Sequence, residues 1–471
     1  MLTGSKRVAG AGCCRLMLCL LAQAGFLANA RAQPRNFPEE ASSAPAAAAA
    51  SAAVDRSGSE GGLMPAKPFP WQPGAYAGLD RLWAAGAFTG EFRADIAYHH
   101  SLARPADNTI TGSSEVFRHG EVQATQLGLG GDFFYQGAHG RVMTQFGMYS
   151  QTTPRNDPSS ARGQWSLADA YRAISEGYGG YRWEVLGGLN LQAGIFTSYV
   201  GLWSYYNFEN WTYQPSYISS NTPWFFEGVR AQLFVSERLK IEPWLVNGWQ
   251  AYGGLNRWPG FGGQVVWRPT EALSFTFNQY VGVDTLGNPG RKRMHTDDSA
   301  MWKYYDSSSG LVRRMAASLT VDAGCESGGG VTCGSQNMVG VMAYHRIWFA
   351  RDQGAITVGG GAVRNPGRYL ALIPPINGAD ALSGTPYFST NPGDPFVAWD
   401  TQMTLDFLPT PYVIVRAEYT HRAASQPYFS GSGGVTPPGG NQGPKGSLLP
   451  NWTPDLRKTE DRFTLALLVK I

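Results

Sequence analysis

The chain has 471 residues and a formal net charge of +3, with 59 glycines, 13% aromatic residues and only 15% charged residues. Globular domains typically carry about 25% charged residues, and no apolar run here reaches the roughly 20 residues of a membrane-spanning helix. This composition argues against a helical membrane protein and favours an all-β structure.

The first 32 residues have the composition of an export signal. Lys6, Arg7 and Arg15 precede a short apolar core at residues 16–22, and two Ala-x-Ala sites end the segment. We predict that residues 1–32 are cleaved; a short anchor helix is the alternative, for which the apolar core is too short. Cleavage removes four basic residues and no acidic one, so the net charge falls from +3 to −1 and nothing favours nucleic-acid binding.

Residues 33–84 are rich in Ala, Ser and Pro, and we predict a mostly disordered periplasmic linker. From residue 88 onwards apolar and polar residues alternate, as they do on the two faces of a strand. The predicted strands lie near 88–99, 121–135, 141–150, 165–176, 181–196, 225–235, 239–248, 259–268, 272–283, 338–350, 354–364, 395–407, 411–422 and 461–471, with a hairpin of 300–306 and 311–321 between the ninth and tenth.

These strands are about 10–13 residues long, enough to cross the roughly 25 Å apolar band of an outer membrane at a tilt of about 45°. Short turns such as "YQGAHG", "GYGG" and "RDQG" alternate with long loops. We therefore predict that residues 85–471 form an all-β, antiparallel up-and-down transmembrane barrel of about 16 strands, 14 or 18 being the alternatives. A water-soluble secreted β-protein, which would also alternate, is the competing fold.

The last strand has an apolar stripe of every second residue, made by Phe463, Leu465, Leu467, Val469 and Ile471. Leu468 breaks the alternation. We predict that this strand faces lipid and closes the barrel by pairing with the first strand. Residues 463–471 also resemble the signal recognised by the barrel-assembly machinery, although Ile471 stands where that signal usually has Phe.

Cleavage of the signal leaves two cysteines, Cys325 and Cys333, in a short Gly-rich stretch. An even pair in an exported chain predicts a disulfide, and the strand order places it outside the cell. Two free thiols, or a metal or redox pair, are the alternatives.

Four segments, "AGIF" (193–196), "TPWFFEGVRA" (222–231), "WLVNGW" (244–249) and "VRAEYTH" (415–421), resemble the OmpL-like β-barrel porins of Gram-negative outer membranes. The resemblance covers most of residues 85–471. It implies a passive pore and brings no catalytic residue.

The polar parity of the predicted strands would line the bore, where about 16 strands leave room for water. The candidate lining residues are Glu91, Arg93, Asp95, Asn278, Arg314, Asp400, Asp406, Arg416, Glu418 and Arg422. Their charges are mixed in sign, so we expect no strong ion selectivity. The alternative role for each is an ion pair between strands that stiffens the wall.

The third long loop, about residues 197–224, has one charge among many aromatic residues. Its candidate constriction residues are Trp203, Tyr205, Tyr206, Phe208, Glu209, Trp211 and Tyr213. Since water-facing loops are seldom so aromatic, we predict that the loop folds inward and narrows the bore, where its rings could stack on sugars or other weakly charged solutes. The alternative is a latch on the rim or at a subunit contact.

A later stretch, residues 288–301, is predicted as a loop with a basic and an acidic group of residues. Arg291, Lys292 and Arg293 could contact lipopolysaccharide phosphates, and His295, Asp297 and Asp298 are a weak metal signal. A solvated loop is the simpler interpretation. We expect no metal and no cofactor.

We therefore predict a passive water-filled porin for small hydrophilic solutes in the outer membrane of a Gram-negative bacterium. Outer-membrane lipid and lipopolysaccharide would surround it, and a homo-oligomer is considered by analogy only. The alternative function is a structural or surface-interaction (adhesin-like) barrel with no open channel. Since no Ser/His or Asp/His arrangement falls on neighbouring strands, we expect no enzyme of the barrel lipase or protease kind.

Overall fold

A computed structural model of the chain describes residues 71–72, 83–113, 115–367, 369–370, 375–383 and 395–471. The predicted signal peptide, residues 1–32, and most of the predicted linker lie outside these residues. By its contacts the chain divides into residues 1–52 and 53–471, and everything below concerns the second unit.

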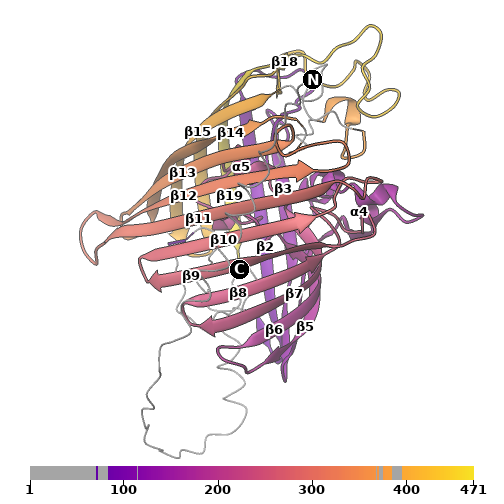
Figure 1. Cartoon of the computed structure of the whole chain (residues 1–471). Coiled ribbons are helices and arrows are strands. Elements are labelled where there is room, and N and C mark those ends of the chain that lie inside the picture. The colour runs from indigo at the N-terminus through magenta and orange to yellow at the C-terminus, as the bar shows by residue number, and fades with distance from the viewer. Residues whose placement is uncertain (1–70, 73–82, 114, 368, 371–374, 384–394) are drawn as a thin grey trace, which may run out of the picture. The chain divides into compact units, whose positions relative to one another are not determined.

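Sixteen antiparallel strands form one closed sheet in the described part of the chain (Figure 1). They are β2 (Phe88–Ser101), β3 (Val122–Tyr135), β4 (Ala138–Thr144), β5 (Ile174–Trp183), β6 (Leu189–Thr197), β7 (Phe225–Ser236), β8 (Leu239–Val246), β9 (Gly260–Thr270), β10 (Leu273–Gly282), β11 (Lys292–Asp306), β12 (Val312–Ser327), β13 (Asn337–Phe349), β14 (Gly354–Asn365), β15 (Phe396–Thr410), β16 (Val413–Ala424) and β19 (Thr459–Lys470). Each pairs with its sequence neighbour, as an up-and-down barrel requires.

Three two-residue strands complete the β-structure of the described residues. β1 (Ala84–Ala85) pairs with the start of β2, and β17 (Phe429–Ser430) pairs with β18 (Leu456–Arg457) in the last long loop. The predicted fold class and the predicted count of about 16 spanning strands are therefore confirmed.

The barrel closes where the last strand meets the first, as predicted. β19 pairs with β2 in a register that sets Leu465 opposite Tyr98. Phe463, Leu465 and Leu467 are exposed on the outer face, as the alternation requires. Leu468 points the other way and is fully buried in a cluster that includes Tyr213. The residue that breaks the apolar stripe thus packs inside the barrel.

Three predicted strands near the start of the barrel are wrong, and one of them, 181–196, runs across the end of β5, a turn and β6. Predicted strand 165–176 is largely a loop with the helix α4 (Leu167–Tyr171), capped by the Ser166 hydroxyl, which accepts a hydrogen bond from the Asp169 N–H. Predicted strand 141–150 ends earlier, since β4 stops at Thr144.

The turn predicted at "GYGG" is also wrong, because these glycines lie within β5. A Cβ at Gly180 would stand 2.2 Å from the carbonyl oxygen of Leu191 on β6. Glycine therefore serves close strand approach here and not a turn. The chain turns later, between Trp183 and Leu189, where Leu186 has a φ of 56°.

The loop predicted over residues 288–301 is mostly strand, because β11 begins at Lys292. Arg293 is buried and donates to Glu326 at 2.9 Å. His295 is buried with its Nε2 2.9 Å from Asp322. Of the basic trio, only Lys292 is exposed. No group of metal-ligating side chains occurs within the described ranges.

Short helices occur only in the connections between described strands. They are α3 (Tyr149–Thr152), α4, α5 (Tyr217–Asn221), and the 3-10 turns η2 (Pro154–Asn156), η3 (Ser159–Ala161), η4 (Asn207–Glu209) and η5 (Ile376–Gly378). None of the described helices has the length and apolarity to cross a membrane. The predicted disulfide is present between Cys325, near the end of β12, and Cys333.

Candidate functional site: the loop between β6 and β7

The connection from β6 to β7, residues 198–224, lies against the inner face of the barrel. Trp203, Tyr206, Trp211 and Tyr213 of the predicted constriction set are buried, as is Glu209, and Tyr205 and Phe208 are partly buried. The loop holds η4 and α5, and its backbone contacts side chains from strands far away in sequence.

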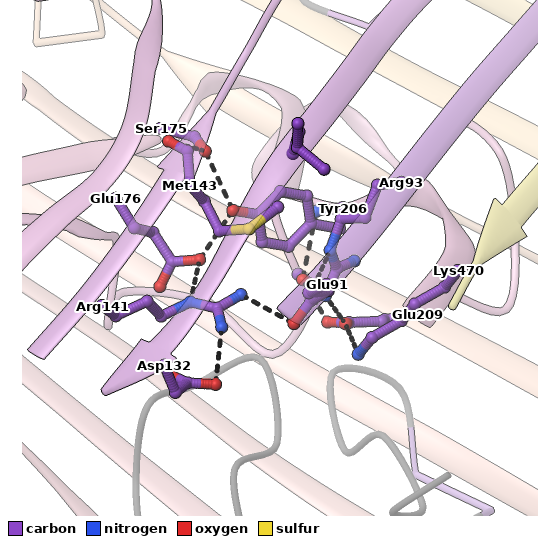
Figure 2. A network of polar contacts seen from close by, with 12 residues as sticks. Glu91, Arg93, Asp132, Arg141, Met143, Ser175, Glu176, Tyr206, Glu209 and Lys470 are labelled. Carbon is purple, nitrogen blue, oxygen red and sulfur yellow. Dashed lines mark hydrogen bonds and ion pairs between the residues drawn. The ribbon is translucent and has the colours of Figure 1, made fainter. Parts of the chain in front are cut away.

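One anchor is a network of charges around Glu209, the only charged residue of the loop (Figure 2). Glu209 accepts hydrogen bonds from Arg93 of β2 at 2.7 Å and from Lys470 of β19 at 3.0 Å. The Arg93 guanidinium lies 3.7 Å from the centre of the Tyr206 ring and is also paired with Glu91. A buried carboxylate is stable only when opposite charges compensate it, and here two cations do so.

The network continues along the wall through Arg141 of β4 (Figure 2). Its guanidinium is within 3.1 Å of Glu91, 3.0 Å of Asp132 and 3.0 Å of Glu176. The Tyr206 hydroxyl donates to Glu176 at 2.6 Å. Through this hydrogen bond Tyr206 connects the loop to β5, the strand next to β4 in the barrel wall.

A second anchor is Arg416 of β16, which holds the loop backbone. Its guanidinium donates to the carbonyl oxygens of Asn207, Asn210 and Thr212 at 3.0, 2.7 and 2.8 Å. It also makes two hydrogen bonds to Asp406 of β15, at 2.7 and 2.9 Å. The five donors of a planar guanidinium suit this arrangement, which no other side chain could reproduce.

Carboxylates on nearby strands accept hydrogen bonds from the same loop. Glu418 accepts from the backbone N–H groups of Tyr213 at 2.6 Å and Gln214 at 3.0 Å. Asp400 accepts from the Tyr217 N–H at 2.9 Å, and Asp95 accepts from the Tyr213 hydroxyl at 3.0 Å. An irregular buried loop needs such partners for its backbone, and the wall supplies them.

The remaining candidate lining residues have different surroundings. The Arg422 guanidinium lies 3.9 Å from the Tyr217 ring centre and donates to the Gly112 carbonyl oxygen. Asn278 forms hydrogen bonds with neighbouring wall residues; for instance, its Oδ1 accepts a hydrogen bond from the Gln264 side-chain amide at 3.1 Å. Arg314 lies near the turn after β13 and pairs with Asp352 at 3.1 Å.

Sequence reasoning did not single out several anchors. Arg346 of β13 donates to the Trp211 carbonyl oxygen at 3.0 Å and to Asp406 at 2.8 Å. Arg346 and Lys470 both lie on correctly predicted strands, at alternate positions that face inward. The alternation could therefore have identified both residues. Glu176 and Arg141 fall at the ends of misplaced strands, where no parity could be assigned.

A cleft opens between the loop and the β2–β3 connection. It is lined by Glu115, Trp203, Tyr205 and Trp224, among others. The Glu115 carboxylate accepts from the Ser220 hydroxyl at 3.2 Å. Aromatic faces, hydroxyl groups and one carboxylate therefore meet at this place.

The extracellular connections also contact each other. The Asp380 carboxylate, in the β14–β15 connection, accepts from Lys445, in the β16–β19 connection, at 2.8 Å. Burial alone would raise the pKa of Asp380, but Lys445 and hydrogen bonds from Ser383 and Leu382 outweigh it and lower the pKa to about 2.

The depressed pKa predicts a pH dependence for this contact. A carboxyl with a free pKa of about 3.9 stabilises the folded contact above about pH 4, and the contribution is lost as the pH falls through about 2. Pepsin cleavage of residues 425–458 should be slower in the wild type than in Asp380→Asn at about pH 4. The two rates should converge near pH 2. A constant ratio across this range would contradict the assignment.

A closed 16-strand barrel with an apolar outer face, a polar inner face and a loop held inside defines a porin-like outer-membrane barrel. Residues 91–443 match the family described as "Putative beta-barrel porin-2, OmpL-like", and the chain belongs to this family. The predicted resemblance is thus confirmed, and the family indicates the outer membrane of a Gram-negative bacterium.

Solved structures with a similar course of the chain are outer-membrane proteins. OmpT of Vibrio cholerae is 8% identical, with 83% of this chain and 100% of that chain covered and a TM-score of 0.45. The channel DcaP of Acinetobacter baumannii is 12% identical, with 83% and 100% covered and a TM-score of 0.44. An anion-selective porin from Comamonas acidovorans is 8% identical, with 82% and 99% covered and a TM-score of 0.44. No curated protein sequence matches the chain.

Proposed function

We propose that the protein is a passive, water-filled channel for small hydrophilic solutes, narrowed by the loop of residues 198–224. The observation that carries the proposal is the anchoring of this loop by Arg93, Arg416, Glu418 and Lys470, which project from the adjacent strands β2, β16 and β19 on the inner wall. A loop serving only as an outer latch would have no need of partners on the inner wall.

The charges around the loop support weak ion selectivity. Arg416 is compensated by Asp406, Arg93 by Glu91, and Lys470 by Glu209. Because these pairs cancel at short range, they leave little field for a passing ion. The aromatic cleft beside the loop is the place where a weakly charged solute would stack.

The partners we propose follow from the outer surface. β4 has only seven residues, whereas a lipid-exposed spanning strand needs about 9–11. A second copy of the chain covering this short sector would shield it, and elsewhere lipid and lipopolysaccharide would face the apolar residues. We also propose export through residues 1–32 and recognition of residues 463–471 by the barrel-assembly machinery.

Planar-bilayer recording of the purified, detergent-extracted barrel tests the function. We expect discrete conductance steps, little preference between anions and cations, and partial block by sugars. A folded, heat-modifiable barrel that never conducts would overturn the channel and favour the structural or adhesin-like alternative.

A further inference from the structure

Two described residues of the predicted linker, Trp71 and Gln72, lie inside the barrel, whereas Trp83 and Ala84 at its end are exposed. Trp71 is only 2% exposed and Gln72 only 7%. Trp71 belongs to a buried cluster with Trp203 and Trp211 of the loop and Trp348 of the wall. A segment expected in the periplasm thus contributes a large aromatic side chain to the interior.

The loop itself holds this residue. The indole N–H of Trp211 donates to the Trp71 carbonyl oxygen at 3.1 Å, while Arg346 fixes Trp211 through its own carbonyl oxygen. Trp211 also packs edge-on against Trp348, with ring centres 5.6 Å apart. We call Trp203, Trp211, Met301 and Trp348 the Trp71 socket, since all four share the buried cluster with Trp71.

The socket lies on the side of the loop where the short turns are. Trp348 is the residue before the end of β13, and Ala355, another member of the cluster, follows the start of β14. Lys303, whose Nζ is 6.0 Å from the Trp71 ring centre, lies three residues before the end of β11. Since short turns face the periplasm in such barrels, Trp71 occupies the periplasmic side of the passage.

We propose that Trp71 is a built-in stopper: its indole fills the periplasmic side of the passage beneath the loop and reduces flow through the resting channel. The inference rests on the proposed channel.

The contact is built to be reversible. The indole N–H of Trp71 and the side-chain NH₂ of Gln72 are buried without a hydrogen-bond partner among the described residues. Unsatisfied buried donors penalise the docked state, and at 6.0 Å Lys303 adds only a weak attraction to the ring. Apolar packing and one hydrogen bond hold the segment, so a solute could displace it.

The test compares Trp71→Ala with Trp83→Ala, a matched tryptophan of the same segment that is 49% exposed. In planar bilayers Trp71→Ala should raise the mean conductance about twofold, since removing a bulky group beneath the loop widens the passage, and Trp83→Ala should leave it unchanged. Equal conductance in all three proteins overturns the stopper and leaves the channel standing. If none of the three proteins conducts, both the channel and the stopper are overturned.

Discussion

Deleting residues 203–217 is expected to raise the single-channel conductance about two- to threefold, because a pore's narrowest point sets its conductance. The deletion removes Glu209, Trp211 and Tyr213, through which the wall holds the loop. It takes 15 of the 27 residues between Thr197 and Phe225 and leaves 12. Since β6 and β7 are paired neighbours, the shortened connection closes at little entropic cost.

The matched control is deletion of residues 438–443, a mostly exposed stretch of the β16–β19 connection. We expect this second deletion to leave the conductance unchanged. Sugar block should weaken only in the first variant, because the aromatic cleft is lost with the loop. An unchanged conductance after removal of residues 203–217, in a barrel that still folds, would rule out the loop as the constriction.

Arg416→Met is expected to release the loop and to destabilise the barrel by about 3 kcal/mol, the lower end for breaking a buried ion pair. The estimate is at the lower end because Asp406 keeps Arg346 as a partner. Three loop carbonyl oxygens lose their donor. We expect noisy conductance with several sub-levels in place of steady steps, and a lower urea midpoint of unfolding in detergent.

Arg416→Lys should give an intermediate result, because an ammonium keeps the charge but cannot reach three carbonyls and a carboxylate at once. Arg351→Met serves as the control, since Arg351 is exposed in the turn after β13. Steady conductance and an unchanged urea midpoint in Arg416→Met would show that the guanidinium does not hold the loop.

Alternation was a reliable guide wherever a strand faces two chemically different surroundings. The strands from β7 onwards except the first half of β11, the closing pair β19–β2 and the Cys325–Cys333 bond follow from the sequence. The alternation of apolar and polar residues failed to locate β4 and β5, because the glycines of β5 have no side chains that could alternate. A run such as Gly179–Gly180 looks like a turn unless the close approach of the next strand is known.

The inward course of the loop could be anticipated from its aromatic content, but its anchors could not. Arg416 and Asn207 are 209 positions apart, and Lys470 and Glu209 are 261 apart. Nothing local in the sequence couples such pairs; they meet only because the sheet closes. The same holds for Trp71, which looked like part of a linker and lies beside Trp211.

The ion pair between Lys470 and Glu209 has a consequence for the order of assembly. Glu209 belongs to the middle of the chain, whereas Lys470 is the last residue of β19, and its strand completes the cylinder. Until that strand docks beside β2, the loop lacks one of its two cationic partners at Glu209. A barrel left open at the seam would therefore hold the loop less firmly, and only the closed barrel supplies both cations to Glu209.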